Sequence, residues 1–151
     1  MYSKSFEEFY KSSGISTDTR AISKDCLFVC IKGENFDGNT FASTALKQGA
    51  RHVIVDDKAY FTQPKSMTLV TNSVTYLQEL ANFHRKKFKI PVIGVTGSNG
   101  KTTTKELIQK VLAKKYKVLA TIGNLNNHLG VPFTLLRLTE EHDIAIIEMG
   151  A

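Results

Sequence analysis

Apolar residues in this chain fall into short runs separated by polar and glycine-containing segments, which is typical of an α/β protein. Short β-branched runs predict strands at 27–31, 52–55, 68–71, 92–95 and 118–121, and a last strand that ends at Glu148. Apolar residues near helical spacing predict helices at 6–11, 40–47, 73–87, 101–116 and 131–138. Thr40 and Ser73 are the expected N-caps of two of them. The expected buried stripe of the 101–116 helix is Leu107, Ile108, Val111, Leu112 and Tyr116. Helices alternating with strands indicate mostly parallel sheets, and residues 92–95 read as a buried parallel strand.

The chain is expected to contain two α/β domains, with a boundary near Pro91. Its 151 residues allow one large domain or a small one plus part of another. A basic run at 85–89 followed by proline marks the end of a small first domain, 1–89. Residues 90–151 would begin a second domain with a mostly parallel sheet, which looks cut short.

The segment 92–105 has the features of a phosphate-binding loop. A strand is followed by Gly97 and Gly100, whose backbone can take conformations closed to other residues, and then by a predicted helix. Lys101 could reach the β- and γ-phosphates, and the Thr102 hydroxyl could ligate magnesium. The usual spacing would place a glycine where Val95 stands. A plain glycine-rich turn is the alternative.

Two further polar features follow predicted strands of the second domain. Residues 123–130 contain three asparagines and a histidine at the carboxyl end of a strand, the edge where parallel sheets bind ligands. Glu148 ends the last strand, where a second magnesium contact is needed. An asparagine-rich turn and a charged strand end remain as alternatives.

The first domain has two polar segments whose role the residues alone leave open. Residues 16–20 place three hydroxyls, a carboxylate and a guanidinium together, which turn chemistry alone would explain. Residues 32–39, with two glycines, are either an ordinary loop or a binding loop.

The formal net charge of +6 favours anionic partners. The basic residues, however, gather at 85–89 and 114–117, where they complement helix dipoles. No zinc-finger or RNA-binding signature accompanies them, so we expect no nucleic-acid partner. No apolar run approaches a membrane span and the first ten residues lack a signal peptide's apolar core, so we expect a cytoplasmic protein without a membrane partner. We also expect a monomer.

Cys26 and Cys30 would lie on one face of a strand but about 13 Å apart, too far for a disulfide. The histidines form no metal spacing with them, so two free core thiols are predicted. His84 falls on or beside an apolar helix face and is expected to be a packed or capping residue.

Five segments together resemble the Mur ligases, three-domain enzymes of bacterial wall synthesis. These segments are Gly94–Thr104, Asp18–Arg20, Gly33–Gly38, Gly123–Asn127 and Glu148–Ala151, and the resemblance covers nearly the whole chain. In this family the first domain holds the UDP part of the substrate, the second holds ATP and the third brings the amino acid or dipeptide.

The resemblance implies roles for individual residues. The expected ATP-binding residues are Gly97, Ser98, Asn99, Gly100, Lys101, Thr102 and Thr103. Those expected to bind the UDP-muramoyl substrate are Thr19, Arg20, Asp37, Gly38 and Asn39 on the UDP side, and Asn124, Asn126 and Asn127 on the peptide side. Thr102 and Glu148 would hold Mg²⁺, and Lys101 and Glu148 would be catalytic. Similar sequences often have histidine in place of Asn39, which weakens the case for a phosphate contact there.

The implied reaction is an ATP-dependent peptide ligation in which ATP and Mg²⁺ are the cofactors. Within the family, the motifs favour the ligases that join D-alanyl-D-alanine to UDP-N-acetylmuramoyl-tripeptide through an acyl phosphate. These 151 residues alone are expected to be inactive. The alternatives are another Mur ligase, a folylpolyglutamate-synthetase-like amide ligase, or a non-catalytic nucleotide-binding module.

Overall fold

The computed structural model describes residues 3–150 and confirms the α/β class. The chain divides into two compact units, the first ending at Leu77 and the second beginning at Gln78. This boundary lies inside helix α3 (Ser73–Arg85). A division at residue 89, beyond the end of that helix, therefore remains a prediction. Three residues lie outside the described part of the chain. Met1 and Tyr2 belong to the first ten residues considered above for a signal peptide, and Ala151 is the last residue of the Glu148–Ala151 motif.

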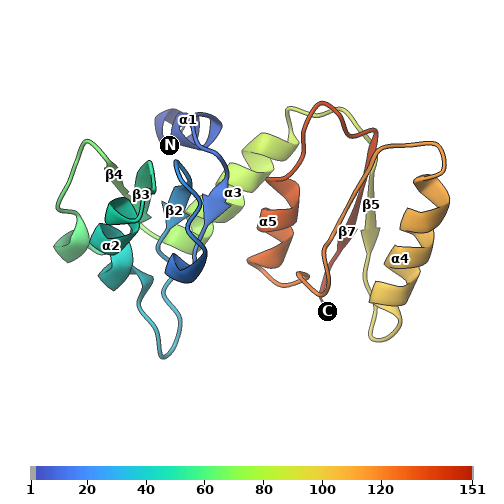
Figure 1. The fold of residues 1–151 in the computed structure, drawn as a ribbon. Coiled ribbons are helices and arrows are strands. Elements are labelled where there is room, and N and C mark those ends of the chain that lie inside the picture. The colour runs from blue at the N-terminus through green and yellow to red at the C-terminus, as the bar shows by residue number, and fades with distance from the viewer. Residues whose placement is uncertain (1–2, 151) are drawn as a thin grey trace. The chain divides into compact units, whose positions relative to one another are not determined.

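The first unit is built on a parallel sheet with the strand order β1-β2-β3-β4. Its strands are β1 (Ile15–Ser16), β2 (Leu27–Val29), β3 (His52–Val55) and β4 (Met67–Leu69). Its helices are α1 (Ser3–Tyr10), α2 (Ala42–Lys47) and the start of α3, with short 3₁₀ turns at Thr19–Ala21, Gly38–Phe41 and Lys58–Tyr60. Figure 1 shows α2 beside β3.

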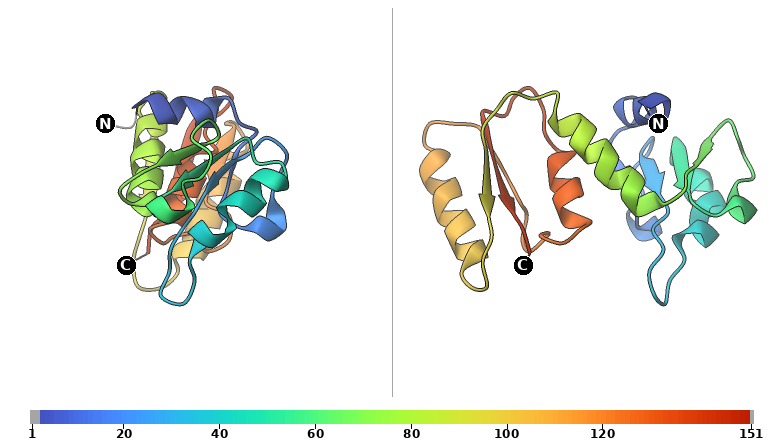
Figure 2. Two further views of the ribbon diagram at one scale, coloured as in Figure 1. Left: turned by 90° about the vertical axis from the view of Figure 1, so that its left-hand side faces the viewer. Right: turned by 180° about the vertical axis from the view of Figure 1, so that it is seen from behind.

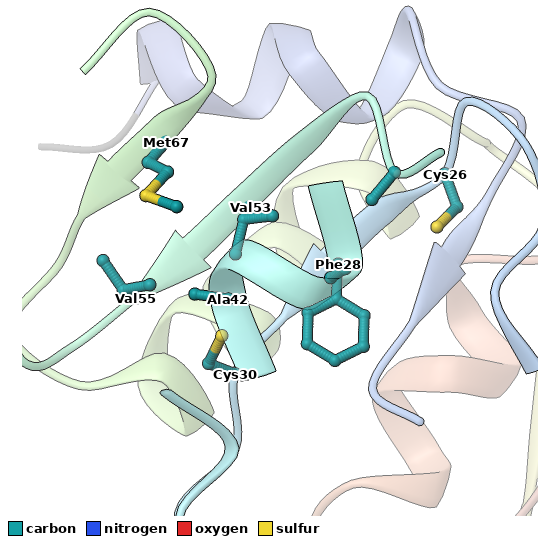
Figure 3. Close-up of a cluster of buried hydrophobic side chains, with 9 residues drawn as sticks. Cys26, Phe28, Cys30, Ala42, Val53, Val55 and Met67 are labelled. Atoms are coloured by element: carbon teal, nitrogen blue, oxygen red, sulfur yellow. The ribbon is translucent and has the colours of Figure 1, made fainter. Parts of the chain in front are cut away.

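Alternation along β2 and β3 builds the core of the first unit. Cys26, Phe28 and Cys30 belong to one buried cluster together with Val53, Val55, Met67 and small residues of α2, as Figure 3 shows. The intervening Leu27, Val29 and Ile54 are equally buried and point to the opposite face. Both cysteines are free, as predicted.

The two cysteines are expected to resist thiol reagents while the protein is folded. Burial raises the pKa of Cys30 to about 12, with smaller contributions from Asp56 and Asp37, and burial also raises that of Cys26. Because the thiolate is the reactive form, this raised pKa leaves Cys30 with roughly a thousandfold less thiolate at pH 8 than an ordinary exposed cysteine has. Titration with a chromogenic disulfide should give no fast phase in the native protein and two reactive thiols in guanidinium.

A Cys30→Ala variant makes that measurement specific, because only Cys26 then remains to react. A native protein in which either thiol reacts as fast as in guanidinium would contradict the buried placement.

The second unit contains a parallel sheet with the order β5-β7-β6. Its strands are β5 (Val92–Val95), β6 (Val118–Ala120) and β7 (Ile144–Glu148). Helix α4 (Lys101–Leu112) lies on one face of this sheet and α5 (Gly130–Leu135) on the other (Figures 1 and 2). The central strand therefore has covered side chains on both faces.

Side chains alternate between the two faces of the sheet along β7, and this decides toward which face the Glu148 carboxylate points. Ala145 and Ile147 pack with Leu135 of α5, whereas Ile146 packs with Ile108 and Leu112 of α4. Glu148 is two residues after Ile146, so its side chain points to the α4 face. The strand period thus directs this carboxylate toward the helix that begins after the glycine loop.

Several expectations about helix ends and turns were wrong. Asn72 caps α3 by accepting from the Thr75 N–H, so Ser73 is the first helical residue and not the cap. Thr40 is not the cap of α2, because it lies in the 3₁₀ turn that Asp37 caps. Strand β1 and the 3₁₀ turns were not predicted, since they are too short to show periodicity.

The predicted buried stripe of the 101–116 helix was only partly right, because Ile108 and Leu112 are covered whereas Leu107, Val111 and Tyr116 are exposed. Leu107 and Val111 are 59% and 72% exposed, whereas Lys105 is buried. The covered face of α4 carries Lys105, Ile108 and Leu112, since only these face the described sheet. Strand β5 is likewise not fully buried, because it forms an edge of that sheet and Val92 is 37% exposed.

His84 is buried as expected, with its ring Nε2 3.0 Å from the Leu138 carbonyl oxygen. The basic residues 85–89 and 114–117 lie at or after helix ends, as predicted. In residues 3–150, no helix has the length and apolarity that a membrane crossing would require.

Candidate functional site

The glycine loop between β5 and α4 has the conformation that its sequence predicts. Gly97 and Gly100 have φ angles of +140° and +76°, which L-residues with a side chain rarely adopt. Gly100 is the N-cap of α4, so the free N–H groups of the first helical turn face the end of this loop. These groups and the positive end of the helix dipole would attract a phosphate.

Side chains of the loop are available to a ligand. Ser98, Asn99 and Thr103 are exposed, and the Lys101 side chain folds back so that its Nζ donates to the Gly97 carbonyl. An ammonium has three donors, so two of them remain for phosphate oxygens. The Lys101 side chain therefore lies against the glycine loop, where it was expected to contact phosphates.

The structure brings Thr102 and Glu148 together, although 46 positions separate them in the chain. The Thr102 hydroxyl donates to Glu148 Oε1 at 3.1 Å, and the Asn126 amide donates to the same oxygen at 2.8 Å. The backbone N–H of Glu148 donates to the Thr121 hydroxyl at 2.9 Å. The three predicted polar features of the second unit thus meet at one carboxylate.

Lys105 completes this cluster, which we call the Glu148 cluster: Thr102, Lys105, Asn126 and Glu148. The Lys105 Nζ lies 3.5 Å from Glu148 Oε2 and donates to the Gly123 carbonyl at 2.9 Å. Both side chains of this ion pair are almost completely buried, at 2% and 1% exposed. Glu148 Oε2 is buried without a hydrogen-bond donor, so the ion pair is the contact that compensates its charge.

Glu148 is expected to be ionised at neutral pH. Burial raises its pKa, but hydrogen bonds from Asn126 and Thr102 and the positive charge of Lys105 outweigh burial, and the pKa is lowered overall. A buried carboxylate held in its charged form beside a threonine hydroxyl provides the hard oxygen ligands that Mg²⁺ prefers.

The asparagines of the 123–130 loop play different parts. Asn126 contacts Glu148, and its backbone carbonyl accepts from the Gly150 N–H at 2.7 Å. The Asn127 side chain accepts from the backbone N–H groups of Leu129 and Gly130 and so holds the start of α5. Asn124 is exposed. Asn126 therefore belongs to the Glu148 cluster, and Asn127 shapes the loop.

A second candidate site is a pocket of about 630 Å³ in the first unit. It is lined by Thr17, Asp18, Thr19, Arg20, Phe28, Phe36 and Phe41. The rings of Phe36 and Phe41 are stacked with centroids 5.5 Å apart, and Phe36 is 53% exposed. The pocket thus combines an aromatic wall with polar groups of the 16–20 turn.

Arg20 is paired with Asp18 at the rim of this pocket. The Arg20 Nε and one terminal nitrogen donate to the Asp18 carboxylate at 2.7–3.1 Å. The side-chain hydrogen bonds from Arg20 lower the pKa of Asp18 to about 2. The guanidinium has five N–H donors, so several stay free for an anionic ligand.

Asn39 lies inside the protein and not at the pocket surface. It is fully buried, and its amide donates to Asp37 and Asp56, both at 2.8 Å, and accepts from the Asp56 N–H at 3.1 Å. Asp37 caps the turn that contains Gly38 and Asn39. All hydrogen-bonding groups of Asn39 are occupied, so we infer that it holds the turn beside Phe36 and makes no contact with substrate.

The sequence-based site set missed Lys105 and four pocket residues, Thr17, Phe28, Phe36 and Phe41. Lys105 follows Thr102 by three residues and so lies on the same helix face, a spacing visible in the sequence. Phe36 lies inside one of the five motif segments. Nothing in the sequence around Phe28 and Phe41 distinguishes them from ordinary core residues.

Comparisons with known proteins identify relatives of this chain. The family model described as "Mur ligase family, catalytic domain" matches residues 11–119, and the "Mur ligase middle domain" model matches residues 95–151. The UDP-N-acetylmuramoyl-tripeptide--D-alanyl-D-alanine ligases of Bacillus subtilis and Escherichia coli are 44% and 42% identical over 91% of this chain. The chain spans about 30% of the length of each of these two relatives.

Solved structures show the same similarity. A crystal structure of MurF from Acinetobacter baumannii matches with a TM-score of 0.84 and 37% identity, over 91% of this chain and 30% of that one. MurF from Thermotoga maritima in complex with ADP matches with a TM-score of 0.81 and 36% identity, over 91% of this chain and 32% of that one. With a catalytic-domain model matching more than half of its residues, the chain belongs to the Mur ligase family.

Proposed function

We propose that this chain belongs to an ATP-dependent ligase of peptidoglycan precursor synthesis, which joins D-alanyl-D-alanine to UDP-N-acetylmuramoyl-tripeptide. The observation that carries the proposal is the Glu148 cluster beside the glycine loop, where Thr102 and Glu148 are 3.1 Å apart. The names of the relatives from Bacillus subtilis and Escherichia coli supply the substrates. The ADP complex of the Thermotoga maritima neighbour supports nucleotide use.

The residues present fit a magnesium ion. Glu148 Oε2 is a buried carboxylate oxygen without a hydrogen-bond donor, and the Thr102 hydroxyl contacts the other oxygen of the same carboxylate. Among residues 3–150, no group of three or more histidine, cysteine, aspartate or glutamate side chains gathers to form an all-protein metal site. This suits Mg²⁺, which usually takes one or two carboxylates and completes its shell with phosphates and water. When bound, the ion would offset charge on the phosphates.

The chain's own groups would favour phosphoryl transfer by position and charge. The substrate's terminal carboxylate must attack the γ-phosphate of ATP, so two anions must approach each other. Lys101 and the N–H groups at the start of α4 would lower that repulsion and hold the phosphates in line. This step would give an acyl phosphate and ADP. The amine of D-alanyl-D-alanine would then attack the acyl carbon to form the peptide bond, as phosphate leaves and the amine loses a proton.

The pocket of the first unit is proposed to hold the UDP end of the substrate. The exposed face of Phe36 is suited to stack on uracil, because aromatic rings stack on bases regardless of their hydrogen-bonding edges. The free N–H donors of Arg20 and the hydroxyls of Thr17 and Thr19 would contact the diphosphate and ribose. Asp37, Gly38 and Asn39 would support the aromatic wall from behind.

Binding calorimetry on the protein tests both halves of the proposal. Titration with UDP-N-acetylmuramoyl-tripeptide and, separately, with Mg²⁺ and ATP should each give one saturable site. Phe36→Ala is expected to weaken the UDP ligand by about 5- to 150-fold, the equivalent of roughly 1–3 kcal/mol of base stacking. Leu69→Ala, an exposed apolar residue of the same unit outside the pocket, is the matched control.

The outcomes separate the rival functions. ATP binding without UDP-ligand binding would reduce the proposal to an unspecified ATP-dependent ligase, such as a folylpolyglutamate-synthetase-like enzyme. Tight nucleotide binding that does not depend on Glu148 would favour a non-catalytic module. Because the chain spans about 30% of the length of its ligase relatives, we expect these 151 residues to bind ligands without forming product.

A further inference from the structure

Lys105 is a buried cation that the proposed phosphoryl transfer does not use. It is 1% exposed, belongs to α4 and lies one helical turn beyond the glycine loop. Its Nζ makes two described contacts, with Glu148 Oε2 at 3.5 Å and with the Gly123 carbonyl at 2.9 Å. A lysine is almost never fully buried unless it is paired, so its partner indicates its role.

The pairing with Glu148 follows from the geometry of both elements. Lys105 lies three residues after Thr102, so both side chains face the sheet from the same side of α4. Glu148 points to that face because of the alternation along β7. The buried ion pair is therefore electrically neutral in the ligand-free protein, and no bound cation is needed to compensate the carboxylate.

This neutrality has a consequence for magnesium. A free Mg²⁺ ion at Thr102 and Glu148 would join an ammonium that already lies 3.5 Å from the single carboxylate, giving an excess of positive charge. A nucleotide triphosphate brings several negative charges to the adjacent loop and removes that excess. Metal binding at Thr102 and Glu148 would therefore be favourable only when nucleotide is bound as well.

We propose that Lys105 is a positioning residue that makes magnesium binding at Thr102 and Glu148 depend on bound nucleotide. It does so as the resident counter-cation of Glu148, which suppresses binding of free Mg²⁺ and holds the carboxylate ready for the metal–nucleotide complex. The inference rests on the proposed metal role of Thr102 and Glu148.

Titration of MgCl₂ without nucleotide tests this role in wild type and in Lys105→Gln. Glutamine removes the charge and can still donate to the Gly123 carbonyl. A unit charge within about 4–6 Å changes the equilibrium of an ionic group by roughly one to three powers of ten. We therefore expect Lys105→Gln to bind free Mg²⁺ at least about tenfold more tightly than wild type. Mg²⁺ should raise its unfolding midpoint above that seen in NaCl of equal ionic strength.

Two controls make the result specific to charge at this position. Lys110→Gln removes an exposed lysine of the same helix and should behave as wild type. Lys105→Gln combined with Glu148→Gln should lose the gain, because the ligand itself is gone. Lys105→Met serves as a second neutral variant, and the wild-type titration alone remains decisive if neither variant folds.

Tight binding of free Mg²⁺ by wild type, or unchanged affinity in folded Lys105→Gln and Lys105→Met, would overturn the proposal. Failure of wild type to bind ATP with Mg²⁺ would instead refute the proposed function. The two failures are distinguishable because one is measured with metal alone and the other with nucleotide.

Discussion

Replacing Glu148 by glutamine is expected to abolish the magnesium dependence of nucleotide binding and to destabilise the fold. The variant keeps the size of the side chain but leaves the Lys105 ammonium buried without its carboxylate. Breaking a buried ion pair by removing one partner costs about 3–5 kcal/mol of unfolding free energy. Loss of the charged metal ligand should weaken Mg²⁺–ATP binding at least on the order of tenfold.

Denaturant unfolding and calorimetry with and without Mg²⁺ measure these two effects separately. The control is the double variant Lys105→Met with Glu148→Gln, in which both buried charges are removed. It should recover much of the lost stability, because a buried ion pair can often be replaced by apolar groups at little cost. It should not recover the magnesium dependence. If Glu148→Gln bound ATP with the wild-type magnesium dependence, Glu148 would not be the metal ligand.

Lys101→Ala is expected to weaken ATP binding by about 10- to 150-fold. The estimate corresponds to one charge-assisted hydrogen bond of roughly 1.5–3 kcal/mol, and a desolvated contact would make the loss larger. Stability should change little, because the Lys101 side chain is partly exposed and its one described contact is with the Gly97 carbonyl. Calorimetric titration with Mg²⁺ and ATP measures the effect directly.

The matched control for this variant is Lys110→Ala, which removes a lysine from the exposed side of the same helix. It separates a specific phosphate contact from a general loss of positive charge. Binding of UDP-N-acetylmuramoyl-tripeptide should be unaffected in both variants, since the pocket proposed for it is in the other unit. Unchanged ATP affinity in Lys101→Ala would remove Lys101 from the proposed site.

The candidate site shows where local sequence information is sufficient. Gly97, Gly100, Lys101 and Thr102 follow one another, so their backbone conformation and their place at the start of a helix follow from short-range rules. Both glycines have the positive φ angles expected, and the helix begins at Lys101. Glu148 could be placed at a strand end, because a β-branched run followed by glycine shows where the strand stops.

Lys105 shows where such rules fail. A charged residue beside Leu107, Ile108 and Val111 reads as part of the solvent face, so the predicted buried stripe does not include it. The buried face was instead chosen by the sheet, which covers Ile108 and Leu112 and leaves Val111 72% exposed. A buried lysine is stable only with a partner, and its partner Glu148 is 43 residues away in the sequence. No local pattern contains that information.

Asn39 illustrates the same limit in the first unit. In the sequence it is one polar residue of a glycine-containing loop, equally suited to bind substrate or to shape a turn. In the structure its side-chain amide donates hydrogen bonds to Asp37 and to Asp56, which is 17 residues away. Burial and long-range hydrogen bonding favour the turn-shaping role, where the residue type alone left both roles open.

The sequence by itself determined the α/β class, the glycine loop with its helix, the strand that carries Glu148, and two free thiols, because these depend on periodicity and local backbone preferences. The tertiary structure alone decided which face of α4 is buried, how Glu148 is neutralised and which aromatic rings line the pocket of the first unit. Those outcomes depend on strand order and on contacts between residues far apart in the chain, where the energy of burial overrides local preference.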